Sequence, residues 1–352
     1  MFRIAVVVTS RASWARVQTV VEALRQAEAR KQVHLDLIWA GAAVLPRYGD
    51  VSMPHDERIY SVIDGETLET MATETGLLTM RLAGTFARTR PDLVVTVADR
   101  HETIATAISS SYMNIKLAHV QGGERTGQID DRVRNAVSQL ADLHFPATIQ
   151  AGTNLVGMDV RGPILVHGCP SIDLSARVAS YAAPPGNPIV VINHAVTTES
   201  QWAFTQAQAT CTAIRERKEP VLWLWPGEDA GAGEADRAIR QLAAEKRSSI
   251  SFRRHIPAMA FLSILSKARC IVGNSSAGIR ESSFLGTPAI NIGTRQEGRE
   301  RGENVIDVSH DADEIAAAIQ HQIDHGPYAQ STLYGDGTAG PKIAASMMEF
   351  LQ

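Results

Sequence analysis

Cysteine is scarce in this sequence, and positive charge is not in excess. Only three cysteines, Cys169, Cys211 and Cys270, occur in 352 residues, and they lie far apart. Their spacing suits neither a disulfide framework nor a metal site, so we expect a reduced, cytoplasmic protein with no bound metal. The formal net charge of -4 argues against broad nucleic-acid binding, which needs clustered positive surface.

Long hydrophobic runs are also missing. No apolar stretch approaches the roughly 20 residues that cross a bilayer, so we expect no membrane partner. The first ten residues, MFRIAVVVTS, are too short for a signal peptide and lack a cleavage pattern, and they predict a strand instead. What remains is an ordinary globular composition, 44% hydrophobic and 20% charged, over a length sufficient for two domains.

Short apolar runs alternate with amphipathic stretches along the first half of the chain. Strands are predicted at residues 4–8, 33–40, 93–97, 117–120 and 164–166, and helices at residues 17–29, 68–89, 104–112 and 133–141. This alternation predicts an α/β doubly wound fold, in which a parallel sheet carries helices on both faces.

The segment ASYAAPPGNP, residues 179–188, interrupts the pattern with proline and glycine, and the alternation then restarts. Further strands are predicted at residues 189–192, 221–225, 250–252, 271–272 and 289–292. We therefore expect an N-terminal domain (1–178), a C-terminal domain (188–340) and a final helix (341–352) that packs back on the first domain. Two such domains form a cleft, and ligands bind beyond the carboxyl ends of the strands.

The segment VGNSSAGIRE places small residues between a predicted strand and a helix pattern: Asn274, Ser275, Ser276 and Gly278, with Glu281 just behind them. Free N–H groups at a helix start, serine hydroxyls and a side-chain-free glycine suit a phosphate or diphosphate. Glu281 could then accept from ribose hydroxyls. The alternative is a serine N-cap without a ligand. The loop is neither a Walker loop nor GxGxxG, so alone it indicates only an anion.

Acidic residues follow two predicted strands of the first half. Asp99 comes after the strand at 93–97, and Glu124 after the strand at 117–120, with Asp130 and Asp131 ahead of a helix pattern. Because parallel strands end at one edge of a sheet, these acids should gather there, where they could serve as general acid and base. The alternative roles are helix capping, which we favour for Asp130, and solvated charge.

Two cationic or titratable residues are placed to face the same cleft. Arg11 follows the first strand and could hold a phosphate, and His194 follows the first strand of the second half.

Taken together, these segments resemble the hydrolysing UDP-N-acetylglucosamine 2-epimerase family of bacterial sialic-acid-type pathways. The stretches that carry the resemblance occur in the family's order over nearly the whole chain: TSRASWARV, ADRHETIATAISSSYMNIKLAHVQGGERTGQIDD, HGCPSIDL, INHAVTTES, GNSSAGIRESSFLGTPAINIG, RQEGRERGENVIDV and YGDGTAG. The resemblance implies a GT-B fold, two Rossmann-like domains with a nucleotide sugar between them.

The resemblance also implies roles for individual residues. The loop from Asn274 to Gly278 would cradle the diphosphate, Glu281 would hold the ribose, and Arg11 and His194 would face the diphosphate. The catalytic candidates are Asp99, Glu124, Asp131 and His194, and His255 and Ile256 are candidates for contact with the base. No cofactor is expected, and we expect a homodimer.

The implied reaction converts UDP-N-acetylglucosamine, or a close analogue, and water to N-acetylmannosamine, or its analogue, and UDP through a 2-acetamidoglycal. A GDP sugar remains an alternative substrate. Three other functions stay open: a non-hydrolysing epimerase, a GT-B glycosyltransferase and a non-catalytic nucleotide-sugar-binding protein. The binding protein has no reason to keep Asp99 and Glu124, and the segment HAVTTE lacks the arginine-rich continuation of the non-hydrolysing branch.

Overall fold

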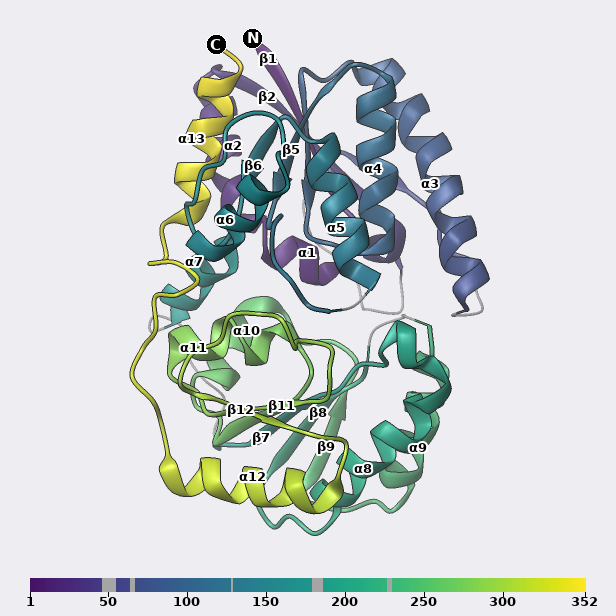
Figure 1. Cartoon of the computed structure of the whole chain (residues 1–352), viewed down its shortest axis with the longest axis vertical. Coiled ribbons are helices and arrows are strands. Elements are labelled where there is room, and N and C mark those ends of the chain that lie inside the picture. The colour runs from purple at the N-terminus through teal and green to yellow at the C-terminus, as the bar shows by residue number, and fades with distance from the viewer. Residues whose placement is uncertain (46–54, 64–66, 128, 179–185, 227–229) are drawn as a thin grey trace.

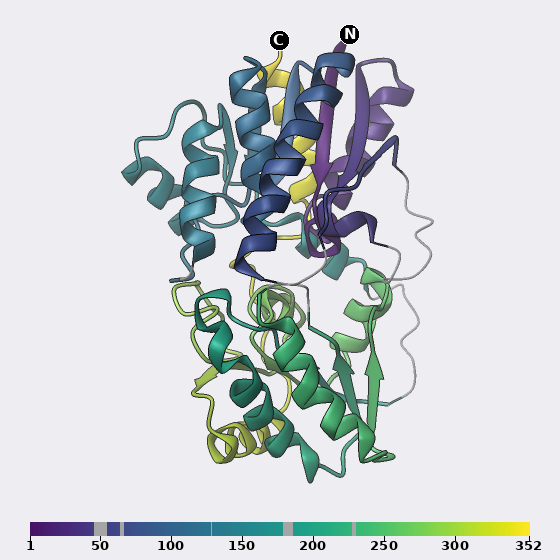
Figure 2. The ribbon, with the colours of Figure 1, turned by 90° about the vertical axis from the view of Figure 1, so that its right-hand side faces the viewer.

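Two six-stranded parallel sheets, stacked along the long axis of the molecule, form the frame of the protein (Figures 1 and 2). The computed structural model describes residues 1–45, 55–63, 67–127, 129–178, 186–226 and 230–352, without the side chains of Arg11 and Ala12. Helices cover both faces of each sheet. This arrangement confirms the expected α/β class and the GT-B fold of two Rossmann-like domains.

The first sheet has the strand order β3-β2-β1-β4-β5-β6. Its strands are β1 (Phe2–Val8), β2 (Val33–Ala40), β3 (Glu57–Ile59), β4 (Leu93–Val97), β5 (Lys116–Val120) and β6 (Leu143–Phe145). The helices of this half are α1 (Arg11–Ala15), α2 (Gln18–Ala29), α3 (Leu68–Thr89), α4 (His101–Tyr112), α5 (Ile129–Leu140), α6 (Ile149–Gly157) and α7 (Pro170–Ala176), with a 3-10 turn η1 (Gly41–Val44).

The second sheet has the order β12-β11-β10-β7-β8-β9. Its strands are β7 (Ile189–Ile192), β8 (Val221–Leu224), β9 (Ile250–Arg253), β10 (Cys270–Gly273), β11 (Ala289–Ile292) and β12 (Val305–Val308). The helices are α8 (Ala203–Arg215), α9 (Ala232–Ala244), α10 (Ala258–Leu265), α11 (Glu281–Leu285), α12 (Ala312–His325) and α13 (Ala339–Phe350), with 3-10 turns η4 (Thr197–Trp202) and η5 (Ser276–Gly278).

Each sheet reverses its strand order between its first and fourth strands, β1 beside β4 and β7 beside β10. At such a switch point the two following loops diverge to opposite faces and leave a crevice, which is where open α/β sheets bind ligands. The loops after β4, β7 and β10 are those that carry Asp99, His194 and the serines of the predicted phosphate loop. The fold thus positions these segments at the two switch points.

Side chains alternate along β1 between two apolar layers. Ile4, Val6 and Val8 pack toward α2 and α13, and Ala5 and Val7 pack toward α3 and α4. Because both faces of the strand are buried, the sequence shows a continuous apolar run rather than an alternating one.

Most predicted elements are confirmed, and the differences have simple causes. The strand predicted at 164–166 is wrong: Ile164 forms only an isolated bridge to His144, and the last strand of the sheet is β6. β6, β3 and β12 were missed because they are short, three or four residues each. Helices α4 and α5 begin three and four residues earlier than predicted, since their first turns are polar and show no apolar spacing. Residues 179–185 of the expected linker lie outside the described residues, and the domain boundaries stay a prediction.

Helix α13 returns from the second half to the first domain and lies against α2 (Figure 1). Ile343, Ala344 and Met347 join the core of the first sheet. The buried carboxylate of Asp173, on α7, accepts hydrogen bonds from the N–H groups of Ala339 (2.8 Å) and Gly340 (2.7 Å). The side chain of Thr338 does not cap the helix, so Asp173 satisfies these donors instead.

The substitution Asp173→Ala should destabilise the protein, because it leaves two buried N–H groups without an acceptor. We expect a loss of about 1–3 kcal/mol in the free energy of unfolding, measured by urea titration. Asp336→Ala is the matched control: Asp336 accepts from the N–H of Thr338 (3.1 Å) at the same helix start but is exposed. Its loss should be a few tenths of a kcal/mol. Equal stability of the wild type and Asp173→Ala would contradict the capping role.

Candidate active site

The predicted phosphate loop follows β10 at the switch point of the second sheet. Gly273 ends the strand with φ of +131°, and a Cβ there would lie 2.0 Å from the carbonyl oxygen of Ile192. Only glycine fits, and the close approach presses the loop against the end of β7. The strand is followed by the short turn η5 and then by α11, which has five residues. A helix this short has a small dipole, so it attracts an anion less strongly than the sequence pattern predicts.

Asn274 fastens the phosphate loop to the loop that carries His194. Its side-chain oxygen accepts from the N–H of His194 (2.7 Å), and its amide donates to the carbonyl oxygen of His194 (2.8 Å). The backbone oxygen of Asn274 accepts from Arg295 (3.1 Å) and Gln296 (2.8 Å). The buried side-chain amide of Asn274 therefore holds the backbone of His194 in place. The side chain of His194, which follows β7, is half-buried.

The serines of the loop differ in their contacts. Ser275 caps η5 by accepting from the N–H of Ala277 at 3.3 Å. Ser276 accepts from the guanidinium of Arg16, which reaches it from the first domain at 2.8 Å. A Cβ on Gly278 would lie 3.7 Å from a side-chain carbon of Ile271, an ordinary van der Waals contact, so an added side-chain atom would not clash there.

Arg16 brings a positive charge to the phosphate loop that the sequence did not predict, and the role of Arg11 stays a prediction. Arg11 is the first residue of α1, and its side chain lies outside the described residues. Burial, and then the nearby charge of Arg280, lower the pKa of Arg16 to about 10, which still leaves it charged at neutral pH. A partly desolvated guanidinium against Ser276 is a suitable contact for a phosphate oxygen.

The three predicted acids meet at one buried arginine. Arg134, on α5, has no exposed side-chain area. Its Nη2 pairs with Asp99, and its Nη1 donates to Asp131 at 2.5 Å and to the carbonyl oxygen of Glu124 at 2.5 Å. The structure therefore brings Asp99, Glu124 and Asp131 together, as predicted for acids at the ends of neighbouring strands.

Asp131 is the most engaged of the three acids. Its carboxylate accepts from the N–H and the hydroxyl of Thr126 (2.8 and 2.7 Å) and from the N–H of Gly127 (2.8 Å), as well as from Arg134. These bonds fold the loop between β5 and α5. Asp130, one residue earlier, lies in the first turn of α5.

Two arginines of the second domain reach the acids of the first. The guanidinium of Arg280, directly behind the phosphate loop, pairs with Glu124. Arg299, in the loop after β11, donates its Nε–H to Glu124 (2.8 Å) and its Nη2 lies 3.3 Å from Asp99. All four side chains are at most 11% exposed, so these ion pairs join the domains out of contact with bulk water.

The arginines keep both acids ionised. Burial alone would raise the pKa of Asp99, but the charges of Arg134 and Arg299 hold it well below its usual range. Burial likewise opposes ionisation of Glu124, yet Arg280, Arg299 and, more weakly, Arg134 lower its pKa to about 2. Glu124 Oε1 is buried and has no hydrogen-bond partner among the described residues, so one oxygen of this carboxylate keeps its acceptor capacity.

The remaining predicted contacts flank this cluster. Glu281 is the first residue of α11, and its buried Oε2 has no hydrogen-bond partner within the described part of the chain, which suits a ribose hydroxyl. His255 and Ile256 lie in the connection from β9 to α10, both half-buried, and Ile256 packs on the core beside β10. Contact of these two residues with the base stays a prediction.

Metal chemistry has no visible ligand set. The pair His321 and His325 on α12 does have four-residue spacing, but the described residues hold no group of three or more His, Cys, Asp or Glu side chains that could bind a metal ion. His325 instead stacks on Tyr328, with ring centroids 3.9 Å apart. The ranges described also contain no helix with both the length and the apolar character needed to cross a bilayer.

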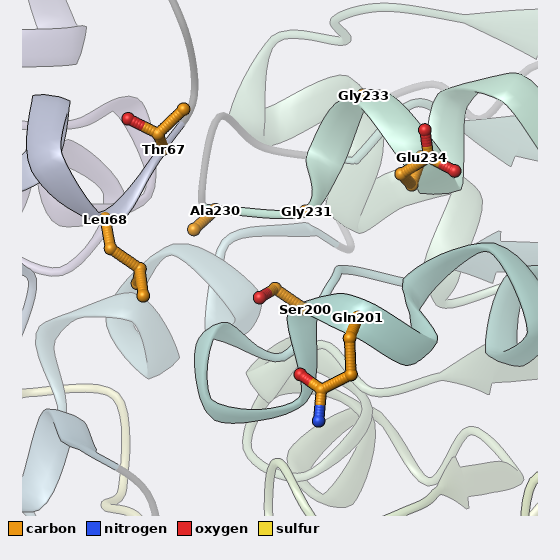
Figure 3. A pocket seen from close by; sticks show the side chains of 8 residues that line it. All are labelled: Thr67, Leu68, Ser200, Gln201, Ala230, Gly231, Gly233 and Glu234. Carbon is orange, nitrogen blue, oxygen red and sulfur yellow. The ribbon is translucent and has the colours of Figure 1, made fainter.

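A cavity of about 430 Å³ opens at another place, where the start of α3 approaches η4 and α9 (Figure 3). It is lined by Thr67, Leu68, Ser200, Gln201, Ala230, Gly231, Gly233 and Glu234. Glu234 is exposed and pairs with Arg237 at 2.8 Å. None of the predicted site residues lines this cavity, and we assign the chemistry to the buried charges instead.

Sequence reasoning missed the four arginines that organise the site: Arg16, Arg134, Arg280 and Arg299. One signal was available, because Arg134 follows Asp131 by three positions and so shares its helix face. The pairing of Arg280 and Arg299 with acids more than 150 residues away has no local signal.

Comparison with known proteins shows the family to which the chain is related. Residues 25–348 match a family model described as UDP-N-acetylglucosamine 2-epimerase. The chain is 28% identical to the "UDP-N-acetylglucosamine 2-epimerase" of Neisseria meningitidis, covering 96% of this chain and 92% of that protein. It is 30% identical to the "UDP-N,N'-diacetylbacillosamine 2-epimerase (hydrolyzing)" of Legionella pneumophila, covering 72% and 69%.

Solved structures show the same fold. The Methanocaldococcus jannaschii UDP-GlcNAc 2-epimerase, solved in complex with UDP-GlcNAc and UDP, superposes with a TM-score of 0.81 at 14% identity, over 99% of this chain and all of that one. Since the family model spans almost the whole sequence and both halves adopt the expected sheets, this chain belongs to the UDP-N-acetylglucosamine 2-epimerase family.

Proposed function

We propose that this protein is a hydrolysing 2-epimerase, which converts UDP-N-acetylglucosamine or a close analogue and water to N-acetylmannosamine or its analogue and UDP. The observation that carries the proposal is the meeting of Asp99 and Glu124 with the arginines beside the phosphate loop, across the two domains. The reaction needs a binding site for the diphosphate and a proton-transfer group within one substrate's length of each other. The arginines of this cluster can bind the diphosphate, and its carboxylates can transfer the proton.

The reaction begins with elimination. The hydrogen on sugar carbon 2 is barely acidic, but breaking the bond from carbon 1 to the diphosphate oxygen builds positive charge on the ring and acidifies it. The nucleoside diphosphate leaves with the electron pair of that bond, a carboxylate takes the carbon-2 proton, and a double bond forms between carbons 1 and 2. Arg16, His194 and the phosphate loop stabilise the departing charge.

Hydration completes the reaction. Water adds its hydroxyl at carbon 1 of the 2-acetamidoglycal, and a proton returns to carbon 2 from the opposite face, which inverts that centre. Asp99 and Glu124 are the two proposed proton-transfer groups, and Asp131 supports them through Arg134. Closed domains would keep the glycal from escaping between the two steps.

Two features favour hydrolysis over the non-hydrolysing reaction, which would return the nucleotide sugar. The Legionella relative carries the word "hydrolyzing" in its name, and the segment HAVTTE in this chain lacks an arginine-rich continuation. UDP is the proposed nucleotide, with GDP as the alternative. We further propose a homodimer in the cytoplasm.

Incubation with UDP-N-acetylglucosamine alone in deuterated water distinguishes the hydrolysing reaction from the alternative functions. We expect free N-acetylmannosamine with deuterium at carbon 2, detected by NMR, because the carbon-2 proton exchanges with solvent during the reaction. Recovery of UDP-N-acetylmannosamine would instead establish the non-hydrolysing reaction. If no nucleotide sugar from a panel of UDP and GDP sugars turns over without an acceptor, the proposal is wrong.

Neutral substitution of the two acids tests the proton-transfer roles. Asp99→Asn and Glu124→Gln should each lower turnover about a hundredfold or more, the usual contribution of a positioned acid or base, while both variants still bind UDP. Supplying 2-acetamidoglucal with UDP shows which half-reaction each variant blocks.

Glu102→Gln is the matched control for these variants. Glu102 is equally buried and pairs with Arg100 (3.0 Å), three residues from Asp99 but outside the acid cluster. It should lose stability with turnover per folded molecule retained. Near-wild-type turnover in both Asp99→Asn and Glu124→Gln would refute the assignment.

The phosphate loop is tested by removing its hydroxyls. Ser275→Ala combined with Ser276→Ala should weaken UDP binding by about 1–3 kcal/mol, the range for hydrogen bonds to a charged group, measured by calorimetry. Ser283→Ala is the control, because this buried serine of α11 donates to Asn304 (2.9 Å) instead. Unchanged affinity of the double variant for UDP and GDP would remove the loop from the site.

A further inference from the structure

Arg280 stands between the phosphate loop and a catalytic acid. It comes two residues after Gly278 in the sequence, and its guanidinium is 1% exposed. Among the described residues it forms one side-chain hydrogen bond, from its Nη2 to Glu124, and the planar group lies over the ring of Tyr334 with its central carbon 5.6 Å from the centroid. One side chain therefore connects the proposed nucleotide site with the proposed proton-transfer site.

The same guanidinium has unused donors. Its Nε–H and an Nη1–H are buried and have no hydrogen-bond partner among the described residues. Leaving buried donors of a charged group unpaired is costly, so a site of this kind favours an anionic ligand that accepts from them. Arg16, which bonds Ser276 of the phosphate loop, lies close enough for its charge and that of Arg280 to repel each other. Two guanidinium groups therefore lie near the loop and near each other.

Glu124 is surrounded by charge from several elements: Arg280 behind the phosphate loop, Arg299 after β11, Arg134 on α5 and Asp99 after β4, with the phenol of Tyr334 nearby. Among the described side chains of this cluster, four guanidinium groups interact with four carboxylates. The guanidinium groups are those of Arg16, Arg134, Arg280 and Arg299, and the carboxylates are those of Asp99, Glu124, Asp131 and Glu281. A diphosphate with two negative charges would make the local charge negative, and protonation of one carboxylate would reduce that excess by one charge.

We propose that Arg280 couples nucleotide binding to the protonation of Glu124. A diphosphate bound at the loop accepts hydrogen bonds from the free donors of Arg280 and neutralises part of its charge. The ion pair with Glu124 is thereby weakened, and the proton affinity of Glu124 rises. This inference rests on the proposed function and describes how nucleotide binding would regulate the proton-transfer group. Without nucleotide, Glu124 is a locked ion-pair partner that neither gives nor takes a proton near neutral pH. With nucleotide bound, it becomes a group that can exchange a proton with the substrate.

Calorimetry of UDP binding in buffers of different ionisation enthalpy measures the protons taken up per nucleotide. The terminal phosphate of UDP itself titrates near pH 6, at about the same position in every variant, so the informative quantity is wild type minus Glu124→Gln. Between roughly pH 5 and 7 we expect a positive difference that grows toward about one proton as the pH falls.

Arg280→Met should shrink this difference, because Glu124 then already has a higher proton affinity before UDP binds. The same variant should move the acidic limb of the kcat/KM profile toward neutral pH, since that profile reports the free enzyme, while the kcat profile moves little. Arg280→Lys, which keeps the charge, should give an intermediate result. Arg217→Met is the control for loss of a partly buried arginine, because Arg217 bonds the carbonyl oxygen of Ala316 (2.7 Å) on helix α12, away from the site.

Three outcomes decide the matter. A proton difference that depends on both Glu124 and Arg280 supports the coupling. UDP binding with the same proton count in the wild type and Glu124→Gln at every pH overturns the coupling and leaves the proposed function standing. Failure of the wild type to bind either UDP or GDP overturns the proposed function and the coupling together.

Discussion

The site depends on one interaction, the pairing of Glu124 with Arg280 and Arg299. The acid belongs to the first domain and both arginines to the second, and all three side chains are at most 5% exposed. A buried carboxylate is stable as an ion only with such partners, and loss of one partner from a buried pair costs about 3–5 kcal/mol. The same contact therefore joins the two domains and keeps Glu124 ionised. If the domains separated, Glu124 would be exposed to water and its pKa would return to the ordinary range.

The folds on either side make this contact possible through their matching strand orders. In both sheets the first and fourth strands are neighbours, so the loops that follow them open at a switch point. Gly273 presses the phosphate loop against the end of β7, and Asn274 then ties it to the backbone of His194. Rigid attachment to strand ends gives the arginine beside this loop a fixed direction toward the opposite sheet. Helix α13, capped by Asp173, brings the chain back from the second half and packs on the first domain, so it also connects the two domains.

The sequence predicted the fold class, most elements and the meeting of the three acids, because those features follow from apolar periodicity and from small or charged residues at strand ends. It did not predict the three- and four-residue strands β3, β6 and β12, which are too short to show a period. It did not predict Arg16, whose guanidinium donates to Ser276 of the phosphate loop. The pairs of Glu124 with Arg280 and Arg299 join positions 156 and 175 residues apart, and no local pattern in the sequence encodes contacts at that separation.

The most direct measurement is a high-resolution crystal structure of the protein with UDP. The account predicts that an oxygen of the diphosphate lies about 3 Å from Nε or Nη1 of Arg280, the distance of a charge-assisted hydrogen bond, while the phosphate also contacts Arg16. A diphosphate bound elsewhere, with Arg280 still pairing only with Glu124, would contradict it.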